Sequence, residues 1–373
     1  MNKLDVEKLL KNIDEAAQYD LTNNKVFGSA YFVYQKNNLK FEKCYGKVGL
    51  NSEKAVDNTT LFRLASMTKP ITAIATLILV ERGLISLDDS IDKYLPEFKN
   101  IHITDSNCND LGTPKTIPTI RNILSHCAGI GSNYDKLTDM TADDKKSLDS
   151  SIAYYIKKGL DFEPTSAQMY SGTGSFDVLT KIIEIVTKTD YLSFLQKEIF
   201  EPCNMVDTTF IPNDEQYGRL IEMHQKVNGE SATFNMLDGC VFESFPCTHF
   251  LGGAGLISSL GDYSKFAEML LNKGKGIITE NTFNQLCTPQ VPKDIMNGKE
   301  RWGLGVRVIT EPDYLYLPVG AFGWSGAYGN HFWIDPINQI FAVFLKNSKF
   351  DGGAANESAR NFEKAVYSSF EDK

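Results

Sequence analysis

The residues with the clearest chemical potential are Ser66 and Lys69, which stand three positions apart where an apolar run enters a helix-forming one. Residues i and i+3 share one face of a helix, so the Lys69 amine is expected beside the Ser66 hydroxyl. A serine alcohol is a weak nucleophile at neutral pH and needs an adjacent base. A lysine serves as that base only when burial or a neighbouring cation lowers its pKa. The spacing therefore predicts nucleophilic catalysis by Ser66, with Lys69 as its activating partner.

The segments around Ser66 must place it at the start of a helix. The approach, residues 60–65, is apolar enough to enter a core, and Pro70 falls in the first turn of the helix that follows. Proline is tolerated there because the first helical N–H groups have no partner in the helix. The apolar run 71–80 predicts a buried helix, and Gly83 suits the residue after its C-terminal end.

Two further segments carry groups with a chemical use. Tyr170 lies in the segment Tyr-Ser-Gly, just before a helix expected from Phe176, and a phenol in such a place can act as general acid or base. Residues 322–336 carry small residues in a strand, which would let a substrate lie close to the backbone and to an N–H that stabilises an oxyanion. Taken alone, each pattern is equally typical of a surface tyrosine or a bulged strand.

Composition and charge exclude several function classes. The chain has 373 residues and a net charge of −9, which argues against nucleic acid as a main partner. Charges interrupt the N-terminal helix and no long apolar segment occurs, so neither an export signal nor a membrane partner is expected. The five histidines are scattered without ligand spacing, so we expect no metal and no other cofactor.

The seven cysteines include no C-x-x-C pair. With no export signal expected, this usage favours free thiols and a cytoplasmic location. Cys127 follows Ser125 and His126, but we interpret it as a small packed residue rather than as a nucleophile.

The order of expected elements predicts a mixed α/β (α+β) fold. A helix and a hairpin come first, a long helical stretch follows, and strands and a final helix end the chain. We predict an antiparallel sheet flanked by the terminal helices, with a helical domain inserted. The predicted sheet domain is residues 1–75 and 250–373, the helical domain is residues 76–249, and the active site lies between them. The later strands are expected at Gly303–Thr310, Leu315–Val319, His331–Ile334 and Ile340–Lys346, before a helix from about Ala355 to Phe370.

Five stretches, in this order and spacing, together resemble the serine β-lactamase/penicillin-binding superfamily. They are residues 61–70, 123–129, 170–172, 252–256 and 324–326. The resemblance is to the class C-like branch, which also holds D,D-peptidases, D-aminopeptidases and family VIII carboxylesterases. It implies a β-lactamase/transpeptidase-like fold and a serine hydrolase.

The resemblance also implies roles for individual residues. Ser66 resembles the nucleophile that becomes acylated, and Lys69 resembles its activating partner. Tyr170 is similar to the tyrosine that carries a proton to the leaving group and later activates water. The backbone N–H groups of Ser66 and Ala327 match the oxyanion hole.

Two positions depart from the family's motifs. Gly172 stands where an asparagine amide usually grips an acylamino group, and Trp324 stands where a lysine or histidine usually meets a carboxylate. Ser325 keeps the hydroxyl of that third motif, and Gly326 keeps its glycine. We expect these four residues to bind substrate, with Trp324 and Tyr328 as possible walls of an acyl pocket.

These departures favour a carboxylesterase that cleaves small esters through an acyl-enzyme on Ser66. One alternative is a β-lactamase or a D,D-peptidase/D-aminopeptidase, whose missing cation could come from Arg301, Arg307 or Lys346. A second alternative is a penicillin-binding module that is acylated without turnover. The expected partner is a small-molecule ester or amide.

Overall fold

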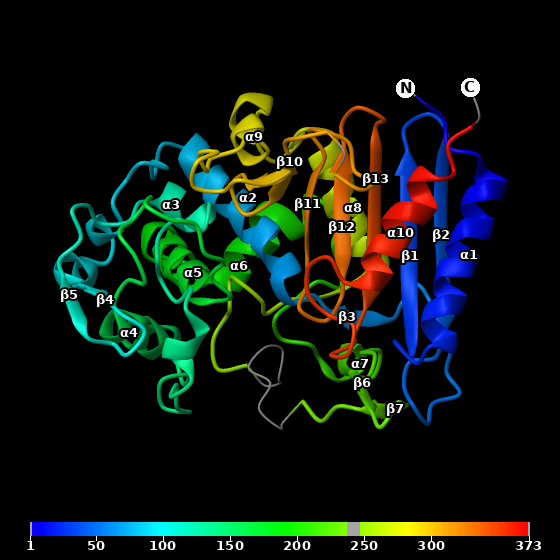
Figure 1. Ribbon diagram of the computed structural model, residues 1–373, viewed down its shortest axis with the longest axis horizontal. Helices are drawn as coiled ribbons and strands as arrows, with labels where there is room; N and C mark the ends of the chain where they lie inside the picture. The colour runs from blue at the N-terminus through cyan, green and yellow to red at the C-terminus, as the bar shows by residue number, and fades with distance from the viewer. Residues whose placement is uncertain (1, 237–246, 313, 372–373) are drawn as a thin grey trace.

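The computed structural model describes residues 2–236, 247–312 and 314–371, and its centre is a seven-stranded antiparallel sheet (Figure 1). The sheet order is β2-β1-β13-β12-β11-β10-β9, so the N-terminal hairpin pairs directly with the last strand. This arrangement confirms the predicted antiparallel sheet. The strands are β1 (Gly28–Gln35), β2 (Leu39–Gly46), β9 (Glu300–Trp302), β10 (Arg307–Ile309), β11 (Phe322–Ser325), β12 (His331–Asp335) and β13 (Ile340–Lys346).

The terminal helices α1 (Val6–Thr22) and α10 (Glu357–Tyr367) lie side by side on one face of this sheet (Figure 1). Asp5 caps α1 by accepting hydrogen bonds from two backbone N–H groups of its first turn. Leu9, Ile13 and Ala17 recur every four residues and are buried, which fixes the face that α1 turns to the sheet. The opposite face of the sheet packs against α8 (Leu260–Leu271).

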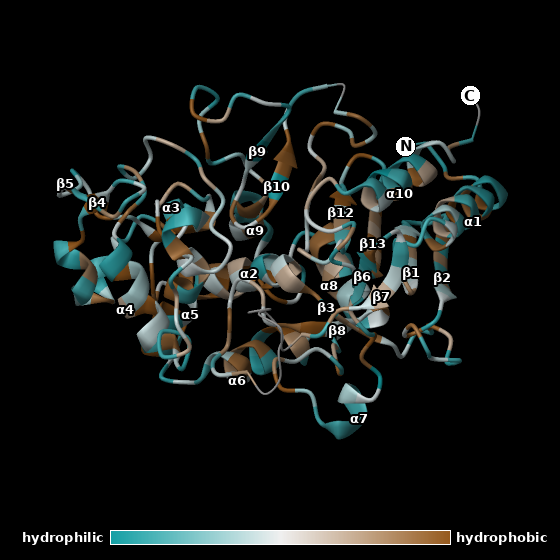
Figure 2. Cartoon of the chain, turned by 60° about the horizontal axis from the view of Figure 1, so that its bottom comes forward, coloured by the Kyte–Doolittle hydropathy of each residue, from teal (hydrophilic) through white to brown (hydrophobic). Residues whose placement is uncertain are grey.

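Strands β1, β12 and β13 of the sheet are buried on both faces, so successive side chains alternate between two cores. Tyr31 and Phe344 face α1 and α10, whereas Phe32 and Val343 face the larger core that continues into the helical region. Strands buried on both faces read as continuous apolar runs rather than as alternating ones. In Figure 2, β10 and β12 are mostly brown (hydrophobic), whereas α1 carries many teal (hydrophilic) residues.

The helical region lies beside the sheet (Figure 1). Its helices are α2 (Thr68–Glu81), α3 (Ile120–Leu124), α4 (Leu148–Lys158), α5 (Gly174–Thr187) and α6 (Tyr191–Leu195). Helix α9 (Glu280–Leu286) contacts α2, and helix α7 (Asp214–Tyr217) lies below the sheet in Figure 1. Three two-stranded sheets complete the chain: β3 (Leu61–Arg63) with β8 (Ile257–Ser259), β4 (Ile103–Thr104) with β5 (Asp110–Gly112), and β6 (His224–Val227) with β7 (Glu230–Thr233).

One predicted strand is wrong. Residues 315–319 form turns, because Leu315 has a left-handed φ of 37° and Pro318 has no N–H to give to a ladder. The predicted domain boundary after residue 75 falls inside helix α2. The division into two domains therefore stays a prediction.

Across the described ranges, no helix combines the length and the apolar character needed to span a bilayer. Six cysteines are free thiols there, and Cys240 lies outside the described residues. Burial raises the pKa of Cys127 to about 11, so this thiol is protonated at neutral pH.

Candidate active site

Ser66 lies in a short 3-10 turn, residues 65–67, between β3 and α2. Ala65 before it has a left-handed φ of 46°, a strained conformation for a residue with a Cβ. Two buried amides hold the entry to this turn. Asn330 Nδ2 donates to the Arg63 carbonyl at 2.7 Å, and the Arg63 N–H donates to Asn347 Oδ1 at 2.9 Å. Strain held by surrounding hydrogen bonds is typical of residues with a chemical role.

The Lys69 side chain is fully buried, and its Nζ lies 3.3 Å from Ser66 Oγ. Nζ also donates to the carbonyls of Gly172 at 2.5 Å and Gly253 at 2.8 Å. A neutral amine has two N–H bonds and one lone pair. With both N–H groups directed to carbonyls, the lone pair can point at the Ser66 hydroxyl.

Tyr170 brings a second titratable oxygen to Ser66. Trp324 Nε1 donates to its Oη at 3.3 Å. Burial raises the pKa of Tyr170 to about 12, and the hydrogen-bonding groups of Ser66 and Trp324 act in the opposite direction. The resting phenol is therefore protonated at neutral pH, and the indole N–H would stabilise a phenolate formed during a reaction.

His126 forms an aromatic platform behind Tyr170. Its ring lies 4.6 Å from the Tyr170 ring and 4.3 Å from the Trp302 ring, between centroids. The Ser171 N–H donates to Nδ1 at 3.2 Å, while Nε2 has no partner among the described residues. Burial, assisted by the Lys69 charge, holds the pKa of His126 well below its usual range. A neutral ring that accepts a backbone N–H positions the tyrosine loop and is not poised as a base.

Helix α5 carries a second buried titratable group near Lys69. Asp177 is fully buried, and neither carboxyl oxygen has a hydrogen-bond partner among the described residues. Burial raises the pKa of Asp177 well above its usual range, against the opposing effect of the Lys69 charge. Burial thus favours the neutral, protonated form of this carboxyl.

Trp324 and Trp302 together wall the site on the side of the sheet. Their rings lie 4.5 Å apart in an edge-on arrangement, and both contact the Tyr170 ring. Trp324 is the residue expected to contact substrate, and its hydrogen bond to Tyr170 cannot be seen in the sequence. Trp302 is a further site residue that the sequence does not indicate, because no motif or spacing links β9 to the tyrosine loop.

Ser325 directs its side chain away from Trp324, and its expected role in substrate binding stays a prediction. Successive side chains of a strand point to opposite faces, and Ser325 follows Trp324. Its hydroxyl is buried and hydrogen-bonded to His331 Nδ1 at 2.8 Å. Gly326 does lie at the site, because a Cβ there would meet the Leu64 carbonyl oxygen at 2.4 Å. This glycine lets the end of β11 approach the strand that leads to Ser66.

Ala327 is exposed between buried neighbours, at the open end of β11. No hydrogen bond within the described part of the chain uses its N–H or that of Ser66, whereas the Ala327 carbonyl accepts from the Gly353 N–H at 3.0 Å. The two free N–H groups fit an oxyanion hole, and that assignment stays a prediction. Tyr328 is buried and packs against Ala65 and Met223, and its expected place in an acyl pocket stays a prediction.

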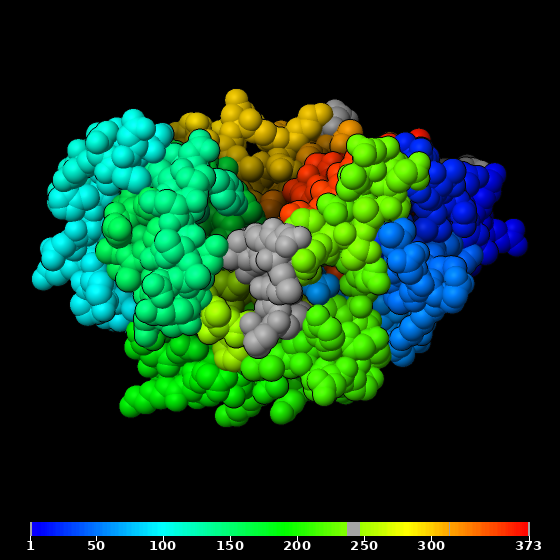
Figure 3. Space-filling view, turned by 90° about the horizontal axis from the view of Figure 1, so that it is seen from below, coloured from blue at the N-terminus to red at the C-terminus, as the bar shows by residue number. Residues whose placement is uncertain are grey.

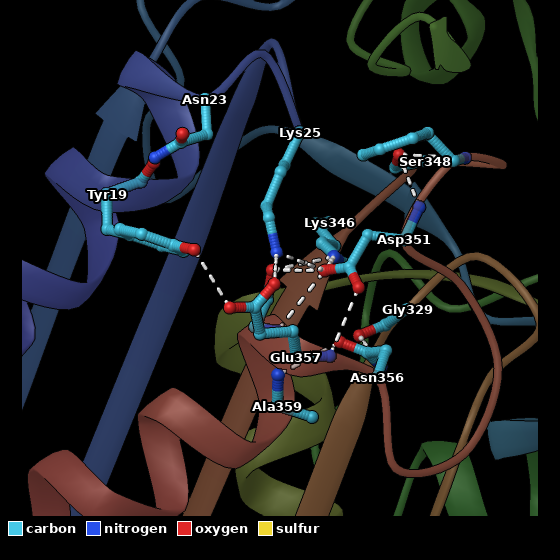
Figure 4. A network of polar contacts seen from close by, with 12 residues as sticks. Tyr19, Asn23, Lys25, Gly329, Lys346, Ser348, Asp351, Asn356, Glu357 and Ala359 are labelled. Carbon is cyan, nitrogen blue, oxygen red and sulfur yellow. Dashed lines mark hydrogen bonds and ion pairs between the residues drawn. The ribbon is translucent and has the colours of Figure 1, made fainter.

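A network of paired charges supports the loop behind Ala327 (Figure 4). Lys346 is fully buried and lies 2.7 Å from Asp351, which also accepts from the Ser358 hydroxyl. Lys25 pairs with Glu357 in the same network. Lys346 is therefore engaged within the protein and cannot supply the cation that the third motif lacks.

The other candidate cations are also engaged. Arg307 is buried and lies 3.4 Å from Glu300 and 3.9 Å from Glu363. Arg301 is half-buried and directs its guanidinium to the Val291 carbonyl at 3.5 Å.

Seen from below, the molecule is hollowed between the segments around residues 130–150 and 220–235 (Figure 3).

Comparison with known proteins places the whole chain in one family. Residues 8–365 match the family described as Beta-lactamase. Among curated relatives, esterase EstB of Burkholderia gladioli is 25% identical over 377 residues, which cover 94% of this chain and 93% of that protein.

Solved structures agree on the fold. EstCE1, a hydrolase with promiscuous acyltransferase activity, aligns with a TM-score of 0.83 at 22% identity over 97% of this chain and 99% of its own. Simvastatin synthase LovD from Aspergillus terreus aligns with a TM-score of 0.82 at 18% identity over 98% and 99%. A penicillin-binding protein homologue from Caulobacter crescentus aligns with a TM-score of 0.77 at 18% identity over 99% of each chain. This chain therefore belongs to the Beta-lactamase family, and it is a serine hydrolase of that family.

Proposed function

We propose that the protein is a carboxylesterase that hydrolyses small neutral esters through an acyl-enzyme on Ser66. The observation that carries the proposal is the hydrogen bond from Trp324 Nε1 to Tyr170 Oη. It puts a neutral indole beside the catalytic phenol, at the motif position where the family usually has a cation. An ester needs no cation there, whereas a substrate carboxylate does.

In the acylation step, Ser66 Oγ attacks the ester carbonyl carbon. The Lys69 lone pair takes the hydroxyl proton, and the N–H groups of Ser66 and Ala327 stabilise the oxyanion. The carbon–alkoxy bond then breaks. The proton passes through Tyr170 to the leaving alkoxide, so an alcohol departs and the acyl group stays on Ser66.

In the deacylation step, water attacks the acyl carbon and gives a proton to Tyr170 Oη, while the phenolic proton of Tyr170 passes to the departing Ser66 Oγ. The bond between the acyl carbon and Ser66 Oγ breaks, a carboxylic acid leaves, and Ser66 is a neutral hydroxyl again. The pKa of Tyr170, about 12, makes its phenolate a strong base once formed, and the Trp324 N–H stabilises it.

Three features support esters over β-lactams or D-peptides. Lys346, Arg307 and Arg301 are all engaged elsewhere. Residue 172 has no side-chain amide for an acylamino group. The relative EstB, which matches nearly the whole chain, is named an esterase.

The test is a substrate panel on purified protein, with p-nitrophenyl acetate, p-nitrophenyl butyrate, nitrocefin and a D-alanine anilide. We expect kcat/KM to be higher for both esters than for nitrocefin or the anilide. The loss of one hydrogen bond to a charged group corresponds to roughly ten- to a hundredfold. Efficient nitrocefin turnover with barely cleaved esters would overturn the proposal in favour of a β-lactamase. A burst of product without steady turnover would indicate a penicillin-binding module.

A further inference from the structure

The space beside Gly172 is filled by another side chain of the same protein. A Cβ at residue 172 would meet Tyr134 Oη at 2.6 Å and other atoms of the phenol ring at 3.2 and 3.4 Å. The φ of Gly172 lies outside the left-handed region, so the backbone does not require glycine there. The glycine instead makes room for the Tyr134 phenol.

The backbone of Tyr134 is held firmly although much of the residue is exposed (57%). Asp161 accepts from the N–H groups of Ser132 at 2.7 Å and Asn133 at 2.9 Å. The same carboxylate pairs with Lys136 at 2.7 Å, and both side chains of that ion pair are buried. Residues on both sides of Tyr134 are thus anchored to one buried group, which fixes the direction of the phenol.

The Tyr134 hydroxyl lies close to the reacting groups and is not used by the protein. Partial burial and the nearby Tyr170 phenol raise the pKa of Tyr134 to about 12. No hydrogen bond between described residues involves its Oη. A fixed hydroxyl beside Gly172, with its hydrogen-bonding capacity unspent, is available to a substrate.

We propose that Tyr134 determines acyl-group specificity, which deepens the esterase function proposed above and rests on it. Its phenol closes the space beside Gly172 and excludes acyl groups that are branched or carry an acylamino substituent next to the carbonyl. Its hydroxyl hydrogen-bonds to the bound ester. The enzyme therefore selects esters of short, unbranched carboxylic acids.

The first experiment varies the acyl group at constant p-nitrophenol, using acetate, butyrate, 2-methylbutyrate and N-acetylalanine esters. Tyr134→Ala should raise kcat/KM for the two branched esters about tenfold relative to acetate, the discrimination that removing a steric block from an apolar pocket typically gives. Tyr134→Phe should keep the steric exclusion and raise KM for all four esters. Tyr19→Ala, on the distant helix α1, is the matched control and should leave the profile unchanged.

A second series varies the alcohol at constant acetate, with methyl, ethyl and p-nitrophenyl esters. The ratios within this series should be the same in the wild type and in Tyr134→Ala. A change confined to this series would overturn the acyl assignment, and so would an unchanged profile in both series.

The contact itself is tested with Gly172→Ala. The added Cβ should displace the Tyr134 phenol and lower kcat/KM for acetate severalfold. Because this loss is the loss of the phenol contact, the double variant Gly172→Ala with Tyr134→Ala should be no worse for acetate than Tyr134→Ala alone. Additive effects would mean that the two residues do not share this space. Ser66 labelling by a fluorophosphonate separates the two proposals. If the wild type is not labelled, the esterase proposal fails, whereas normal labelling with an unchanged acyl profile overturns only the role of Tyr134.

Discussion

Two polar clusters of this molecule are partnered in opposite ways. Around Ser66, the Asp177 carboxyl and His126 Nε2 are buried with no hydrogen-bond partner among the described residues. In the network of Figure 4, the buried Lys346 has a carboxylate and a hydroxyl as partners, and Lys25 has Glu357. Unsatisfied polar groups destabilise a fold, and they persist where they serve a chemical task. The first cluster is built for reaction and the second for stability.

The largest expected effect is the difference between replacing Ser66 and replacing Ser325, which lies 259 positions later in the sequence (325 − 66). Ser66→Ala should abolish ester hydrolysis and labelling by a fluorophosphonate, because it removes the hydroxyl that lies 3.3 Å from Lys69 Nζ. Ser325→Ala should retain labelling, because its hydroxyl faces His331. Intact-mass measurement of both labelled variants checks this, and labelling that survives Ser66→Ala would refute the assignment of the nucleophile.

The next effect tests whether Lys69 and Tyr170 act as one unit. Lys69→Ala and Tyr170→Phe should each lower kcat by ~10²–10⁴, the usual contribution of a general acid or base. The double variant should be little worse than the weaker single one, because both groups handle the same proton. Steady-state kinetics of the three variants decide this point, and full additivity would assign one of the residues a structural role.

Breaking the charge network of Figure 4 should lower the free energy of unfolding. Asp351→Asn should lower the free energy of unfolding by about 3 kcal/mol, since it leaves the buried Lys346 without its carboxylate. The matched control is Glu53→Gln, which removes the exposed partner of Lys47 and should leave the free energy of unfolding nearly unchanged. Denaturant unfolding measures both. Equal losses would show that the network is no more stabilising than a surface pair.

An Asp→Asn substitution near Ser66, at Asp177, should change how the free energy of unfolding depends on pH. A carboxyl whose pKa is raised on folding binds its proton more tightly in the folded state, so stability falls as pH rises above about 3.9, the pKa of an unfolded Asp. Asp177→Asn removes this dependence. Its stability relative to the wild type should rise between pH 4.5 and 6.5, by up to about 1.4 kcal/mol per pH unit. Unfolding at the two pH values tests this, and a constant difference would mean that Asp177 is ionised in the folded protein.

The smallest effect concerns the indole hydrogen bond. Trp324→Phe removes the N–H that Tyr170 accepts, and we expect kcat/KM to fall about tenfold, as for one hydrogen bond to a developing charge. The alkaline limb of the pH–rate profile should move to higher pH, because that bond lowers the pKa of Tyr170. Trp302→Phe is the control, since it keeps a stacked ring and removes no donor to Tyr170. An unchanged pH profile in Trp324→Phe would contradict the role of the indole.

Local patterns predicted most of the fold. The four-residue spacing of Leu9, Ile13 and Ala17 defines α1, and the apolar run Ile340–Lys346 coincides with β13. The strand predicted at residues 315–319 is wrong, although the stretch is mostly apolar. Pro318 cannot donate a hydrogen bond to a neighbouring strand, and Gly320 favours a turn. The left-handed φ of Leu315, which turns the backbone there, has no signal in the local sequence.

The sequence by itself determined which residues could do chemistry, because a serine, a lysine three positions later and a tyrosine before a helix are recognisable from type and spacing. Only the tertiary structure decided what surrounds them. Trp324 donates to Tyr170 and Tyr134 fills the space beside Gly172 across separations of 154 and 38 residues in the chain (324 − 170 and 172 − 134). Such contacts depend on how the sheet and the helical region pack, and no local periodicity encodes them.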